Sequence, residues 1–193
     1  MKTRASKKSP ARPPRIVLGV TGSIAAYKAC ELVRLCVKRG WDVRVVLTEA
    51  AAKFVTPLTF RTLSRNPVGL DAFDEPAAWE PEHIGLAEWA DVLAIAPCTA
   101  NTLAGLAHGL ADNLLLSTAL ASRAPLLLAP AMNTGMWDAP ATQDNLRLLR
   151  GRGANVLEPG SGELACGATG RGRMPEPAAV ADAIEALLPA SVR

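Results

Sequence analysis

Polar side chains that could bind a phosphate or a polar heterocycle follow an apolar run at residues 91–97. The sequence APCTANTL places Thr99, Asn101 and Thr102 directly after this run, and together they offer many hydrogen-bond donors and acceptors. Capping of a following helix would need only one of them, so an ordinary helix start is the alternative interpretation. We expect this cluster to bind a ligand.

A second candidate is Asn133, which follows an apolar run at 125–130 in the sequence PAMNTGMW. Two methionines and a tryptophan are its sequence neighbours, so its amide could bind a carboxylate inside an apolar pocket, where a charged side chain would cost more to bury. A simple turn at Asn133 beside Gly135 is the alternative. The residue types favour an anion-binding amide.

A third candidate is the stretch GVTGSIAAYK at 19–28. Gly22 allows a tight turn, and Ser23 is predicted at the N-cap of the next helix, where free N–H groups and the helix dipole favour a phosphate. The stretch is not G-x-G-x-x-G, and an ordinary capped turn would look similar. Thr48 stands where dinucleotide folds place a ribose-binding acid, and Glu49 follows it, so NAD stays possible although a mononucleotide is favoured.

The stretch LEPGSGELACGATGRGRM at 157–174 is rich in glycine and contains a single cysteine, Cys166. It holds few residues that pack in a helix or strand, so it predicts a long flexible loop. An incidental thiol on a surface loop is the alternative.

The elements that must position these residues are short runs rich in Val, Leu and Ile, typical of parallel strands buried on both faces. The runs lie at 15–20, 42–47, 91–97, 125–130 and 155–159. Helical patterns lie at 24–39, closing at Gly40, at two segments of 99–121 broken near Gly109, at 140–150 and at 177–188. This alternation predicts a doubly wound parallel α/β sheet, a three-layer α/β/α sandwich, with its ligand crevice at the carboxyl ends of the strands.

Composition limits the class of protein. The 193 residues, 49% apolar and 20% charged, predict one globular domain at 15–193 after a disordered basic tail at 1–14. The net charge of +3 comes from the tail, so the body is mildly acidic, which argues against nucleic-acid binding. No apolar run is long enough to span a membrane, and four cysteines without C-x-x-C spacing predict free thiols, no metal and a cytoplasmic location.

Four motifs occur in one order: GVTGSIAAYK, HIGLAEWADVLAIAPCTANT, PAMNTGMW and GELACGATGRGRM. Together they resemble the homo-oligomeric flavin-containing cysteine decarboxylases over about residues 15–174. The resemblance implies a Rossmann-like, flavodoxin-type fold, FMN as cofactor, and trimers or multiples of trimers with active sites between subunits. The most similar branch converts 4′-phosphopantothenoylcysteine to 4′-phosphopantetheine in coenzyme A biosynthesis. There the flavin oxidises the cysteine thiol to a thioaldehyde, CO₂ leaves, and the enethiol is reduced again.

The resemblance also implies roles for single residues. His83, Asn133 and Cys166 match the catalytic positions, with Asn133 on the substrate carboxylate and Cys166 as the proton donor in a clamp at 163–174. The positions that match FMN contacts are Gly22, Ser23, Ile24, Thr48, Thr99, Ala100, Asn101, Thr102 and Ala131. The positions that match substrate contacts are Phe54, Asn133, Met136, Glu163, Ala165 and Met174. Cys98 stands where the family usually has Ala or Ser, which puts a second thiol near the flavin.

Most bacterial relatives continue into a fused synthetase domain, whereas this sequence stops at Arg193. We therefore expect a separate phosphopantothenoylcysteine synthetase in the pathway. One alternative is a peptidyl-cysteine oxidative decarboxylase of lanthipeptide-type biosynthesis. Another is a non-enzymatic FMN-binding regulatory protein, against which the presence of His83, Asn133 and Cys166 argues.

Overall fold

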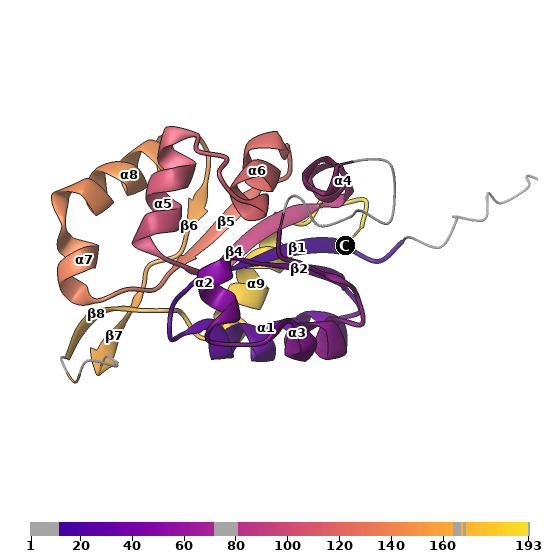
Figure 1. Ribbon diagram of the computed structural model, residues 1–193, viewed down its shortest axis with the longest axis horizontal. Coiled ribbons are helices and arrows are strands. Elements are labelled where there is room, and N and C mark those ends of the chain that lie inside the picture. The colour runs from indigo at the N-terminus through magenta and orange to yellow at the C-terminus, as the bar shows by residue number, and fades with distance from the viewer. Residues whose placement is uncertain (1–11, 72–80, 164–166, 168, 193) are drawn as a thin grey trace, which may run out of the picture.

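Six parallel strands form the central sheet, in the order β3-β2-β1-β4-β5-β6, in a computed structural model that describes residues 12–71, 81–163, 167 and 169–192 (Figure 1). The strands are β1 (Arg15–Val20), β2 (Asp42–Leu47), β3 (Val68–Gly69), β4 (Val92–Cys98), β5 (Leu126–Pro130) and β6 (Asn155–Val156). Apart from the two-residue edge strand β3, this is the flavodoxin-type order, which reverses between β1 and β4. The ligand crevice of such a sheet lies at that reversal.

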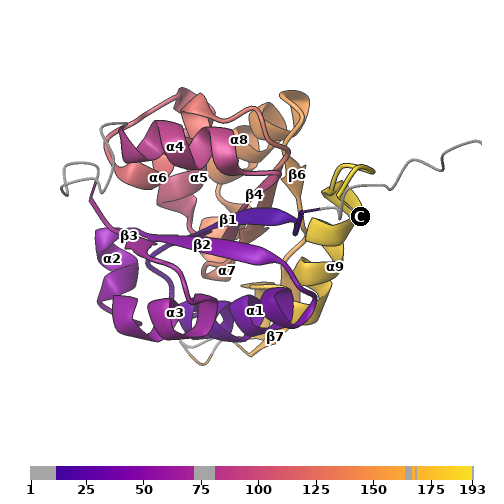
Figure 2. The same cartoon turned by 90° about the vertical axis from the view of Figure 1, so that its right-hand side faces the viewer.

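Helices cover both faces of the sheet (Figure 2). On one face lie α1 (Ala26–Lys38), α3 (Pro57–Ser64) and α9 (Pro177–Leu187), and on the other lie α4 (Glu82–Trp89), α5 (Ala100–His108), α6 (Leu114–Ala121) and α8 (Pro140–Gly151). Two short helices, α2 (Glu49–Ala52) and α7 (Thr134–Asp138), follow β2 and β5. The three-layer α/β/α sandwich predicted from the sequence is confirmed.

The alternation of side chains along each strand explains why the strands are apolar throughout. In β1, Ile16, Leu18 and Val20 belong to the core beneath α1 and α9, whereas Val17 belongs to the core beneath α5, α6 and α8. All four are buried. Since both faces of each central strand are covered, no position along it can be polar without a partner.

Most predicted elements lie where the apolar pattern placed them. β1 and β2 match to the residue, β4 and β5 begin one residue later than expected, and β6 is shorter than the run at 155–159. Gly40 follows α1 with φ of 80°, and Gly109 separates α5 from α6 with φ of 68°. In both places the left-handed conformation suits glycine because it has no Cβ.

The glycine-rich stretch at 157–174 contains more structure than predicted. β7 (Gly160–Glu163) and β8 (Thr169–Arg173) pair as an antiparallel ribbon on either side of its centre, so the expectation of an unstructured loop was wrong. Contacts with the segment after β5 support the ribbon, and these involve distant residues that local sequence patterns do not reveal. Cys166 and Ala165 lie outside the described residues.

The predicted boundary of the basic tail also needs correction. Arg12 forms a bidentate ion pair with Asp91, at 2.6 and 2.7 Å, and the carbonyl oxygen of Pro14 accepts a hydrogen bond from Asp42 N. The Arg12 guanidinium, together with the Arg15 N–H, holds the pKa of Asp91 below its usual range. Residues 12–14 therefore belong to the folded domain. Among the described residues, no helix is both long and apolar enough to cross a membrane.

Candidate active site

The carboxyl ends of β1 and β4 are tied together by Thr21, a residue that the sequence analysis did not select. Its Oγ1 donates a hydrogen bond to the carbonyl oxygen of Pro97, at 2.8 Å, and accepts one from Thr99 N, at 3.0 Å. The side chain is buried, so both bonds are protected from water. The signal in the sequence was a threonine directly after an apolar strand, just before the glycine of GVTGS.

Thr99 caps α5, as the alternative interpretation of the cluster allowed. Its Oγ1 accepts a hydrogen bond from Thr102 N, at 3.4 Å, and lies 3.2 Å from the Thr102 hydroxyl oxygen. Thr102 is buried, Ala100 is half-buried and Asn101 is exposed. The cluster therefore presents a helix N-terminus and an exposed amide at the crevice.

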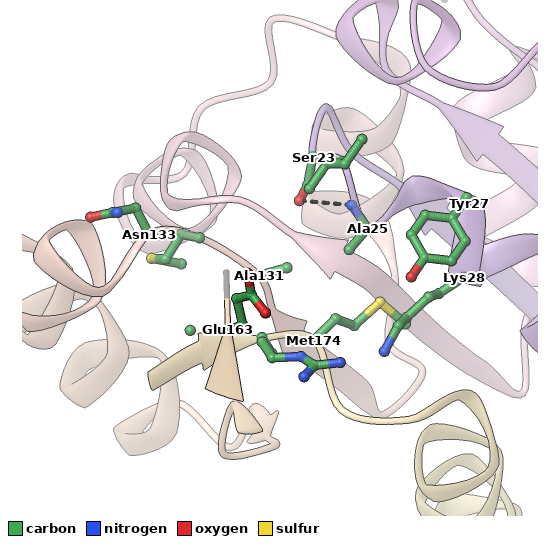
Figure 3. Close-up of a pocket in the computed structure, with 12 residues that line it drawn as sticks. Ser23, Ala25, Tyr27, Lys28, Ala131, Asn133, Glu163 and Met174 are labelled. Carbon is green, nitrogen blue, oxygen red and sulfur yellow. Dashed lines mark hydrogen bonds between the residues drawn. The ribbon is translucent and has the colours of Figure 1, made fainter. Parts of the chain in front are cut away.

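The turn after β1 differs from the prediction in two respects. Helix α1 begins at Ala26, so Ser23 lies before the helix rather than at its N-cap; its Oγ accepts a bond from Ala25 N, at 3.3 Å, within the turn (Figure 3). Gly22 is needed for space rather than for an unusual φ, because a Cβ there would lie 2.5 Å from the Cβ of Ala50 on α2. α2 itself is capped by Thr48, whose Oγ1 accepts from Ala51 N at 3.2 Å.

A pocket of about 610 Å³ brings together many of the residues selected from the sequence (Figure 3). Ser23, Ile24 and Ala131, expected at the cofactor, and Asn133, Glu163 and Met174, expected at the substrate, all line it. These residues come from four separate segments of the chain: the turn after β1, the segment after β5, the end of β7 and the residue after β8. Their convergence supports their selection as one site.

Asn133 does not lie inside an apolar pocket in the single chain. It is exposed, and Figure 3 shows its side chain pointing away from Tyr27 and Lys28 at the other side of the pocket. Its Oδ1 caps α7 by accepting a hydrogen bond from Gly135 N, at 2.8 Å. The turn interpretation is thus correct locally, and it fixes the orientation of the amide.

Two cations line the pocket that the sequence analysis had not selected, Lys28 and Arg173. The Lys28 side chain is 11% exposed, and its Nζ lies 2.8 Å from Glu176 Oε1. This hydrogen bond lowers the pKa of Glu176. The signal for Lys28 was its position four residues after Ile24 in the helix predicted at 24–39, although α1 itself begins only at Ala26.

Some predicted residues lie elsewhere. His83 is on α4, which packs against α6 on the opposite side of the molecule from β7 and β8 (Figures 1 and 2). Phe54 and Met136 are about half exposed and do not line the pocket, whereas Met174 does line it and is almost fully buried. A single chain therefore does not bring His83 and Asn133 together.

The thiols of Cys98 and Cys36 are chemically protected by burial. Cys98 is fully buried among the core residues near Trp137, and burial raises its pKa far above the ordinary value. Burial also raises the pKa of Cys36 to about 12. Cys98 therefore adds no reactive thiol to the crevice. No group of three or more potential metal ligands occurs among the residues that the structure describes.

The fold and the crevice define a flavoprotein. A model of the Flavoprotein family matches residues 4–189, and the chain belongs to that family.

Similar proteins specify the branch of the family. The chain is 47% identical over 162 residues to the coenzyme A biosynthesis bifunctional protein CoaBC of Bacillus subtilis and 51% identical over 162 residues to that of Haemophilus influenzae. Each match covers 84% of this chain but 40% of the relative, so the chain spans about two fifths of the length of these relatives.

Solved structures agree. A cysteine-to-serine variant of PPC decarboxylase in complex with pantothenoylaminoethenethiol has a TM-score of 0.81 and 38% identity, covering 91% of this chain and 98% of that one. The FMN-dependent cysteine decarboxylase SpaF has a TM-score of 0.77 and 31% identity, covering 91% and 98%.

Proposed function

We propose that this protein is an FMN-dependent decarboxylase that converts 4′-phosphopantothenoylcysteine to 4′-phosphopantetheine in coenzyme A biosynthesis. The observation that carries the proposal is that one pocket is lined by Ser23, Ile24 and Ala131, expected at the cofactor, and by Asn133, Glu163 and Met174, expected at the substrate. The similarity to CoaBC proteins and to PPC decarboxylase supports this substrate.

The crevice residues suit FMN. Hydroxyl groups of Ser23, Thr48 and Thr99 and the N-terminus of α5 stand at the carboxyl ends of the strands. None of the expected cofactor positions carries a carboxylate, so nothing among them would repel a phosphate. When bound, FMN supplies the two-electron oxidation of the substrate thiol and the return of these electrons after CO₂ has left.

The chain's own residues would bind and orient the substrate. The Asn133 amide, with two N–H donors on Nδ2, would bind the carboxylate that is lost, and its helix-cap bond to Gly135 N holds it in one orientation. Lys28, which lies across the pocket from Asn133 in Figure 3, would neutralise a phosphate at the other end of the substrate, and Arg173 also lines the pocket. This cationic end favours the phosphorylated substrate over a peptide C-terminus.

Two further residues complete the proposed site. Cys166 would donate a proton to the decarboxylated substrate, and His83 would assist proton transfer from a neighbouring subunit. The position of α4, away from the pocket of its own chain, is consistent with an inter-subunit site in a trimer or a multiple of trimers. We further propose that the protein acts in the cytoplasm, with its substrate made by a phosphopantothenoylcysteine synthetase.

The decisive experiment is to incubate the FMN-loaded protein with 4′-phosphopantothenoylcysteine under air and to identify the product by mass spectrometry. We expect 4′-phosphopantetheine and CO₂ in equal amounts. Recovery of unchanged substrate would refute the proposal. Release of only the oxidised enethiol, combined with turnover of a peptide that ends in cysteine, would instead favour a peptidyl-cysteine decarboxylase.

A further inference from the structure

Both neighbours of Asn133 are hydrogen-bonded to the ribbon strand β8. Met132 N donates to the carbonyl oxygen of Gly172, at 3.0 Å, and the Thr134 hydroxyl donates to the carbonyl oxygen of Arg171, at 2.8 Å. One bond lies before Asn133 and the other after it. The backbone that presents the amide is therefore attached to the ribbon at two adjacent points.

The same attachment leaves no space for a side chain at Gly170 or Gly172 of β8. A Cβ at Gly170 would lie 2.3 Å from Thr134 Oγ1, and a Cβ at Gly172 would lie 2.1 Å from the carbonyl oxygen of Met132. Gly172 also has φ of 136°, a conformation that other residues rarely adopt. These two glycines let β8 approach the segment that carries Asn133.

The ribbon supplies the wall of the pocket that adjoins this segment. Gly172 and Arg173 of β8 line it, as does Glu163 at the end of β7. The distance between the Asn133 amide and this wall is thus set where β8 meets Met132 and Thr134. Of these contacts, only the one from Thr134 is made by a side chain, so it is the one that a substitution can remove cleanly.

We propose that Thr134 is a positioning residue that fixes the Asn133 amide relative to the ribbon wall, so that the amide binds the carboxylate of a substrate lying between them. This inference rests on the proposed function, in which Asn133 binds that carboxylate. The Thr134 hydroxyl itself does not touch the substrate; it acts through the backbone of Arg171.

The test compares two inert probes on the FMN-loaded protein. One is 4′-phosphopantothenoylserine, which keeps the carboxylate but has no thiol to oxidise, and the other is its decarboxylated counterpart. Their dissociation constants, measured by the change in flavin absorbance, give a preference for the carboxylate in the wild type. Thr134→Val keeps the branched shape and removes the donor, whereas Thr134→Ser keeps the donor.

We expect Thr134→Val to reduce the carboxylate preference about two- to tenfold, the range of one hydrogen bond, with unchanged FMN content and melting temperature. Thr134→Ser should keep the wild-type preference. Gly170→Ala should reproduce the loss by displacing Thr134, whereas Gly160→Ala is a matched control on the same ribbon, because a Cβ there meets nothing closer than 3.8 Å.

The outcomes distinguish the role of Asn133 from the role of Thr134. A wild type that binds both probes equally would overturn the role of Asn133 and, with it, this inference. A wild type that prefers the carboxylate while Thr134→Val retains that preference would overturn the role of Thr134 alone. Equal weakening of both probes, or an equal loss in Thr134→Ser, would also contradict it, because the effect would then not come from the hydroxyl acting on the amide.

Discussion

Replacing Asn133 by aspartate separates the structural role of this residue from its proposed role in binding. The Oδ1 atom caps α7 through Gly135 N, and aspartate is as good an N-cap as asparagine. The fold should therefore tolerate Asn133→Asp, with a free energy of unfolding within about 0.5 kcal/mol of the wild type. Asn133→Ala removes the cap and should cost about 1 kcal/mol.

The effect on activity depends on how well the site is screened. A substrate carboxylate about 4 Å from the new charge would be repelled by about 1 kcal/mol in bulk water and by about 4 kcal/mol at the effective dielectric constant of a protein surface. These values correspond to losses of about fivefold and about a thousandfold. Asn133 lies at the surface of the single chain, so the value for a protein surface applies and predicts a loss near a thousandfold.

The assay is kcat/KM for 4′-phosphopantothenoylcysteine, with FMN content and melting temperature measured on the same preparations. We expect Asn133→Asp to lose about a thousandfold in kcat/KM while FMN stays bound. Near-normal activity of this variant would show that Asn133 only caps α7 and would refute the carboxylate assignment.

Five further results are expected. The purified protein should be yellow with one FMN per chain, and finding NAD instead, or no binding of added FMN, would contradict the cofactor. Sedimentation should give a multiple of three subunits; a monomer with full activity would exclude a shared site. Cys166→Ser should release CO₂ once per site and accumulate a product with two hydrogens fewer than 4′-phosphopantetheine. His83→Asn should leave the flavin oxidised. Turnover of either variant at the wild-type rate would show that the residue has no part in the mechanism. Because its folded pKa is lowered, Asp91 contributes stability above its ordinary pKa of about 3.9 that is lost as the pH falls through the folded value. Arg12→Ala should therefore reduce stability slightly at pH 7 and leave it unchanged at a pH low enough to protonate Asp91 in the folded protein, as measured by urea unfolding; an equal reduction at both pH values would contradict the role of the ion pair.

The sheet could be predicted from the sequence because its strands are buried on both faces. Runs such as RIVLGV are short, rich in β-branched residues and apolar at nearly every position, which is typical of a strand covered on both faces. The ribbon at β7 and β8 could not be found in this way. Its glycines have low strand propensity, and it exists because β8 meets Met132 and Thr134, which lie about 40 residues away in the sequence.

The candidate site was predicted in part. Motif positions such as Ser23, Asn133 and Glu163 do meet at one pocket. Lys28 and Thr21 were missed because one is an ordinary helix residue and the other an ordinary strand-end residue until the fold shows what they face. The separation of His83 from the pocket could not be read from the sequence, which gives the order of the motifs but not where the fold places each one.

The hydrogen bonds of Thr21 have a consequence for the binding of a cofactor. They join the ends of β1 and β4 through the chain's own backbone, so the opening between these strands is set before any ligand arrives. A nucleotide that enters this opening does not have to order it, because the conformational entropy of these two strand ends has already been lost on folding. The apoprotein is therefore preorganised, and added FMN should bind to it without a slow refolding phase.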